Sequence, residues 1–125
     1  MLTEVYTMTR SVHLAALALL CVPLCANAHA HLLAATPAEG SVLTQSPANF
    51  LLKFNEAAHL TALSLQRAQD APQKLAPLPA AATAQFTVPA PKLDPGSYTL
   101  SYRVLSDDSH IMSGSIHFRI EPAPH

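Results

Sequence analysis

Alternation of apolar and polar residues is the clearest pattern in this chain. Over residues 98–104 every second residue is Tyr, Leu or Val, with Thr, Ser and Arg between them. This period of two indicates a β-strand with one buried face. The same alternation occurs over residues 50–54, continues at residues 63–65 and returns over residues 115–121. Residues 85–88 predict a shorter strand that ends at a proline.

Turn signals separate these segments. An apolar run over residues 29–35 ends in the turn-rich residues 36–41, and Asp94-Pro-Gly-Ser97 has the composition of a tight turn. Residues 68–82 are rich in Ala, Pro and Gln without any period, so we expect a long loop there. The polar residues 106–109 end the strand before them. About seven short strands separated by turns predict an all-β antiparallel sandwich or barrel.

Residues 1–28 have the features of a secretory signal peptide. Arg10 supplies a positive charge, residues 14–22 form a short apolar core, and Ala26-Asn-Ala28 fits a cleavage site. The apolar core is too short for a membrane anchor, which needs roughly 20 residues. We therefore expect a cleaved leader followed by one domain over residues 29–125.

Cleavage after Ala28 changes the chemistry of the mature chain. Both cysteines, Cys21 and Cys25, leave with the leader, so no disulfide remains. His29 becomes the first residue, and its amine and ring Nδ1 can together chelate one metal ion. Nitrogen donors in a planar arrangement suit Cu(II). His31 offers a competing mode at a flexible terminus, in which the amine, two backbone amides and its ring surround the ion.

Charge and motif content exclude several functional classes. Seven Lys and Arg against eight Asp and Glu give a net charge of −1, whereas a nucleic-acid surface needs clustered basic residues. The sequence has no P-loop, dinucleotide fingerprint or Ser/His/Asp nucleophile pattern. Seven histidines equal the Lys and Arg together, which directs attention to metal ligation.

A second metal-ligand candidate is Asp108-Ser-His110. Residues i and i+2 of an extended chain project to the same side, so the carboxylate and the imidazole can converge on one ion. The segment follows the best strand, at a strand end or loop where sites are often built. Asp107 should face the other way. The remaining histidines of the mature chain are interpreted as ordinary surface or loop residues: His59, His117 and His125.

Four segments together resemble CopC-type periplasmic copper-binding proteins. They are His29-Ala-His-Leu-Leu-Ala-Ala-Thr-Pro-Ala-Glu-Gly-Ser41, Phe54-Asn-Glu56, the strand from Pro95 to Ser106, and Asp107-Asp-Ser-His-Ile-Met-Ser-Gly-Ser-Ile-His-Phe118, which has the family's D-x-H-x-x-x-G-x-x-x-F pattern. The resemblance covers residues 29–121, and its specificity comes from the order and spacing of the four segments.

The resemblance implies a Greek-key β-sandwich or barrel of the cupredoxin-like and immunoglobulin-like type, with a Cu(II) site near one end. Carried over by motif, the ligands are His29, Asp108 and His110, and Glu56 is an additional candidate for an axial or outer oxygen. The resemblance also implies a periplasmic role in copper resistance or uptake, with handover to an inner-membrane copper transporter of the CopD type.

One departure from the family pattern concerns methionine. Some family members carry a Met-rich loop for Cu(I), which prefers thioether ligands. Residues 66–82 contain no methionine, and Met112 is the one methionine after the leader. We therefore predict a single Cu(II) site without a Met-rich Cu(I) site.

Two other functions remain open at this point. The same amine–imidazole chelate can serve a histidine-brace copper oxygenase, although the short chain leaves little surface for a polymer and lacks Trp. A metal-free adhesion or assembly sandwich is the third interpretation, but it leaves the coincidence of His29 and the D-x-H pair unexplained. The favoured prediction is a copper carrier or buffer that is not an enzyme.

Overall fold

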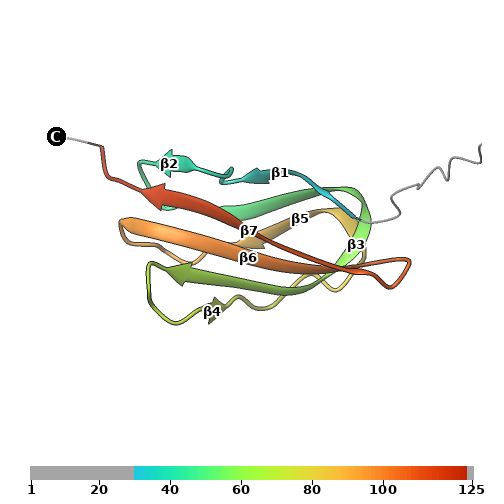
Figure 1. Ribbon diagram of the computed structural model, residues 1–125. Helices are drawn as coiled ribbons and strands as arrows, with labels where there is room; N and C mark the ends of the chain where they lie inside the picture. The colour runs from blue at the N-terminus through green and yellow to red at the C-terminus, as the bar shows by residue number, and fades with distance from the viewer. Residues whose placement is uncertain (1–29, 124–125) are drawn as a thin grey trace, which may run out of the picture.

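The protein is described by a computed structural model over residues 30–123, and this part of the chain is all-β (Figure 1). No helix occurs among these residues, which agrees with the all-β prediction. The strands are β1 (Leu32–Thr36), β2 (Ser41–Leu43), β3 (Asn49–Arg67), β4 (Gln73–Lys74), β5 (Thr83–Pro89), β6 (Gly96–Ser106) and β7 (Ile111–Ile120).

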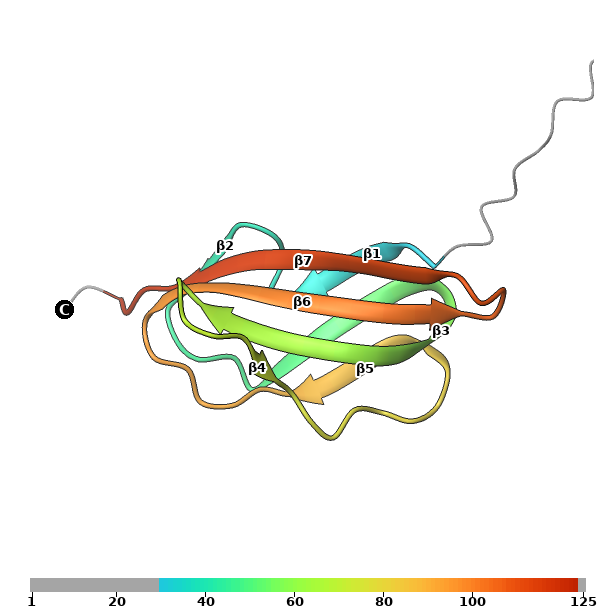
Figure 2. The same ribbon diagram turned by 60° about the horizontal axis from the view of Figure 1, so that its bottom comes forward.

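The long strand β3 organises the sheet. Its first half pairs with β1 and β5, and its second half pairs with β4 and β6. The main path of the sheet runs β1-β3-β6-β7-β2, so strands distant in sequence are neighbours. Only β2 with β7 is parallel among the described pairs. Figures 1 and 2 show that β3 bends and the sheet curls around an interior.

Aromatic side chains fill this interior. The alternating residues of β3, β5, β6 and β7 point inward and are buried, as their period predicts. Phe54 meets Phe86 edge-on at 6.0 Å, and Tyr98 stacks on Phe118 at 5.4 Å between ring centroids. Each fully buried side chain of this kind contributes about 1.5–3 kcal/mol. No cysteine lies in the described part of the chain, so this core carries its stability.

Three predicted boundaries differ from the structure. The segments 50–54 and 63–65 belong to one 19-residue strand, because irregular pairing near residues 53–58 and 60–62 interrupts the alternation without ending the strand. The long loop predicted over residues 68–82 contains the two-residue β4, which pairs with β3. The last strand starts at Ile111 and not at Ser115, since tertiary pairing with β6 extends it through residues 111–114, which show no apolar–polar alternation.

Gly114 lies within that extension, next to an aromatic ring of the neighbouring strand. It pairs with Tyr102 across β6 and β7, and the Tyr102 ring occupies the space that a side chain at position 114 would need. A Cβ atom there would lie 2.6 Å from Tyr102 Cζ. The same ring packs edge-on against Phe54, with centroids 5.6 Å apart. The glycine of the D-x-H-x-x-x-G-x-x-x-F pattern thus makes room for an aromatic ring.

Replacing Gly114 with Ala should lower the free energy of unfolding by about 1–3 kcal/mol, the usual effect of adding a methyl group where no space exists. Chemical denaturation followed by circular dichroism measures the change. Ser113→Ala, at an exposed neighbouring position, is the matched control. Equal unfolding midpoints for Gly114→Ala and the control would show that Tyr102 yields without cost.

The fold gathers three chain segments at one end of the sheet. The start of the described chain before β1, the bend of β3 and the loop between β6 and β7 all lie at this end in both views (Figures 1 and 2). The register agrees, since Leu32 pairs with Phe54 and Ala58 pairs with Ser106 on either side of the bend.

The described residues include no helix with the length and apolar character that a membrane crossing requires.

Candidate metal site

A short, well-bonded loop joins β6 to β7. The Ser106 N–H donates to the His110 carbonyl, and the Ser109 N–H donates to the Ser106 carbonyl, both at 3.0 Å. Ser109 has φ of 67°, in the left-handed region that the tight reversal requires. The backbone of this loop therefore fixes the positions from which the Asp108 and His110 side chains extend.

Asp108 and His110 come together, as the sequence predicts. His110 Nδ1 lies 2.7 Å from Asp108 Oδ2, and the His110 backbone N–H donates to Asp108 Oδ1 over 3.2 Å. The extended backbone assumed in that prediction is wrong, because residues 107–109 form a turn in which Ser109 has a positive φ, and this turn brings the carboxylate against the imidazole. The side chains remain accessible, at 28% exposure for Asp108 and 59% for His110.

The environment of Asp108 stabilises its ionised form. The Ser106 hydroxyl donates to Asp108 Oδ1, and this bond, followed by that with the His110 ring, lowers the pKa of the Asp108 carboxyl to about 2. An ionised carboxylate beside Nδ1 favours the tautomer with the proton on that nitrogen. Nε2 is then the ring nitrogen with a lone pair, as in carboxylate–histidine–metal arrangements.

Ser106 is a participant that the sequence pattern does not single out as functional. Its side chain is 3% exposed at the end of β6 and belongs to the inward-facing series of Leu100 and Val104. A signal was available, because a serine there places a hydroxyl on the buried face just before the D-x-H segment.

The structure does not bring His31 or Glu56 into contact with the Asp108–His110 pair. The His31 backbone is bonded to β3: its N–H donates to Asn55 Oδ1 at 2.5 Å, and its carbonyl accepts from the Asn55 N–H at 3.0 Å. Glu56 is half-buried on β3. Within residues 30–123 no three His, Cys, Asp or Glu side chains gather for a metal ion. The predicted ligand His29 lies outside the described residues.

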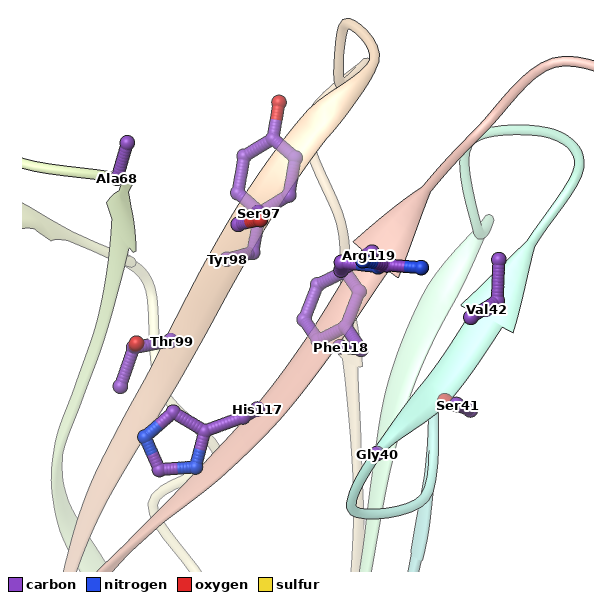
Figure 3. A pocket seen from close by; sticks show the side chains of 10 residues that line it. All are labelled: Gly40, Ser41, Val42, Ala68, Ser97, Tyr98, Thr99, His117, Phe118 and Arg119. Carbon is purple, nitrogen blue, oxygen red and sulfur yellow. The ribbon is translucent and has the colours of Figure 1, made fainter.

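A separate surface groove lies on the outer face of β6 and β7, beside β2 (Figure 3). Its volume is about 450 Å³, and Thr99 and His117 line it from paired positions. These residues are far along both strands from the β6–β7 loop, so the groove is distinct from the candidate metal site. His59 and His117 are exposed, as predicted, whereas His125 lies outside the described residues.

His117 nevertheless has a specific partner. Glu39 accepts from the His117 backbone N–H at 2.7 Å and contacts ring Nδ1 at 2.9 Å. These bonds, the backbone one first, lower the pKa of Glu39 below its ordinary value of 4.5. The pair ties the turn between β1 and β2 to β7.

Glu39→Ala should therefore destabilise the protein at neutral pH but not in acid. A carboxylate with a lowered folded-state pKa stabilises the fold above pH 4.5, and this contribution disappears as the pH falls through the folded-state pKa. As the pH is lowered from 7 to 3, the urea unfolding midpoints of the wild type and of Glu39→Ala should converge. Glu121→Ala, which removes an exposed pair with Arg119, is the control. A difference that persisted undiminished in acid would contradict the assignment.

Comparison with known proteins places the chain in a family. CopC from Methylosinus trichosporium OB3b has 28% sequence identity and a TM-score of 0.68, over 78% of this chain and 98% of that one. PcoC from Escherichia coli, a methionine-rich copper resistance protein, has 25% identity and a TM-score of 0.54, over 74% and 99%. No curated protein gives a significant match. The CopC domain model matches residues 32–121, from the first residue of β1 to just past β7. The chain therefore belongs to the CopC domain family.

Proposed function

We propose that the protein is a periplasmic copper carrier or buffer that binds one Cu(II) ion at the end of the sheet where the β6–β7 loop lies. Its ligands are the amine and ring nitrogen of His29, exposed by signal-peptide cleavage, together with His110 and Asp108. The observation that carries the proposal is the contact of 2.7 Å between Asp108 and His110 at the end where the described chain begins.

The donor set fits Cu(II) as cargo. Imidazole and amine nitrogens suit this ion, which stands at the top of the divalent affinity order. Asp108 holds His110 through Nδ1 and adds a negative charge beside the ion. As a ligand, Asp108 would use Oδ2, while Oδ1 stays with the Ser106 hydroxyl. Since the nitrogen donors must be deprotonated, copper affinity falls on acidification.

The competing mode through His31 is disfavoured. That mode needs a deprotonated His31 amide as a ligand, whereas the His31 N–H donates to Asn55 Oδ1 at 2.5 Å. Ala30 is also buried, at 1% exposure, so the segment is packed against the core. Binding through His31 would give up both interactions.

We further propose that there is no Met-rich Cu(I) site. PcoC is described as methionine-rich, but Met112 is the only methionine among the described residues, and it packs partly buried against the core. Thioether clusters are the ligands that Cu(I) prefers.

A carrier fits the site better than a hydrolase. Ser106, Asp108 and His110 are the residue types of a catalytic triad, but the serine donates to the aspartate and is 3% exposed. A nucleophilic serine instead contacts the histidine and faces the substrate.

For such a carrier, we propose delivery of copper to an inner-membrane transporter of the CopD type.

Titration with Cu(II) tests the proposal. Mature protein with a verified His29 terminus should bind one equivalent tightly, with a nitrogen-rich Cu(II) EPR signal. The same protein with one Met before His29 loses the amine–ring chelate and should bind at least about 100-fold more weakly, since even outer-shell changes cost about 10–100-fold. Equal binding by both proteins would refute the His29 chelate. A loss on His31→Ala instead would identify the competing mode.

A further inference from the structure

A buried hydroxyl underlies the exposed Asp108–His110 pair. Ser106 is the one buried polar residue of the described core, at 3% exposure. Its Oγ donates to Asp108 Oδ1 and also lies 3.1 Å from the His110 carbonyl. Both contacts are local, so the hydroxyl links the end of β6 to two residues of the β6–β7 loop.

We propose that Ser106 is a positioning residue of the metal site, which holds the Asp108 carboxylate and, through it, the His110 ring in place for the ion. This inference rests on the proposed Cu(II) function for its biological meaning. Its structural part concerns the metal-free protein and is testable without copper.

The physical argument concerns rotamer freedom. The His110 side chain is 59% exposed and the Asp108 side chain 28% exposed, so packing alone does not select one rotamer for either. Ser106, by contrast, is buried and its strand is paired, with Ser106 opposite Ala58 of β3. The hydrogen bond from its hydroxyl to Oδ1 therefore restricts the Asp108 carboxylate, and the contact of Oδ2 with Nδ1 restricts the His110 ring. Ordering the ligand before the ion arrives removes an entropic cost of binding.

Two backbone hydrogen bonds hold the loop in addition to this hydroxyl. The Ser106 N–H donates to the His110 carbonyl, and the Ser109 N–H donates to the Ser106 carbonyl, whatever the side chain at position 106. Ser106→Ala therefore removes the clamp and keeps the turn. Ser106→Cys keeps nearly the same volume with a much weaker donor, which guards against a packing defect in the alanine variant. Ser115→Ala is the matched control, because its hydroxyl pairs with Ser101 elsewhere on the same hairpin.

The experiment has one metal-free and one copper readout. Nitrogen-15 NMR of the His110 ring at pH 8 should show the Nδ1–H tautomer in the wild type and in Ser115→Ala. A mixture of tautomers and rotamers is expected in both Ser106 variants. Cu(II) affinity, measured against a competing chelator, should fall about 10–100-fold in both Ser106 variants, as for other groups that orient a ligand, while their circular dichroism spectra stay unchanged.

The outcomes separate the inference from the proposed function. An unchanged His110 tautomer together with Cu(II) affinity within twofold of the wild type would overturn the inference. Wild-type protein that binds no Cu(II) would refute the proposed function, yet the tautomer measurement would still decide whether Ser106 positions His110. An altered tautomer with unchanged copper affinity would overturn the claim that the clamp serves the metal.

Discussion

Replacing His110 with alanine should abolish tight Cu(II) binding while leaving the fold intact. His110 supplies the imidazole that Asp108 orients from 2.7 Å, and the described residues contain no group of three metal-ligating side chains that could substitute for it. Loss of an outer partner costs about 10–100-fold in metal affinity, so loss of a ligand should exceed about 100-fold. The side chain is 59% exposed, so its removal creates no cavity.

Competitive titration and EPR measure this effect, and two other histidines provide controls. His59→Ala and His117→Ala remove exposed imidazoles on β3 and β7 and should bind Cu(II) like the wild type. Unchanged Cu(II) affinity in His110→Ala would show that the β6–β7 loop is not part of the copper site. A loss of binding in His117→Ala instead would move the site to the groove of Figure 3.

Replacing Phe118 with alanine should remove a large share of the protein's stability and lower its unfolding midpoint sharply. Phe118 is 1% exposed, stacks on Tyr98 and packs against Phe50 at 6.1 Å between centroids. Truncating such a ring costs about 3–5 kcal/mol, while a domain of this size is stable by only about 5–15 kcal/mol. Because no described cysteine can form a disulfide, no covalent link compensates.

Thermal and urea denaturation followed by circular dichroism test this second expectation. Phe118→Leu keeps most of the apolar volume and should remain folded, with a smaller loss of stability. It should also bind Cu(II) normally, because Phe118 lies toward the end of β7 opposite to the β6–β7 loop. A Phe118→Ala protein with an unfolding midpoint close to that of the wild type would show that the aromatic stack is not central to the core.

Local patterns were sufficient for most of the strands and for two of the three residues of the described site, Asp108 and His110. Alternation over residues 98–104 identified β6, because a half-buried strand imposes a period of two on its own sequence. Asp108 and His110 were found because their spacing is short enough for the loop itself to bring them together. The long β3 was read in two pieces, since its irregular pairing depends on partners that no local pattern reveals.

The role of Ser106 and the pairing of Glu39 with His117 needed the tertiary structure. Glu39 and His117 are 78 residues apart, and they meet because β2 pairs in parallel with β7. Ser106 becomes informative only when its burial and its contact with Asp108 are known together. The sequence by itself determined the strand pattern and the residue types that suit copper, because both are encoded locally. The folded chain decided that the start of the described chain, the bend of β3 and the β6–β7 loop share one end of the sheet, because contacts between distant segments depend on how β3 bends and which strands it joins.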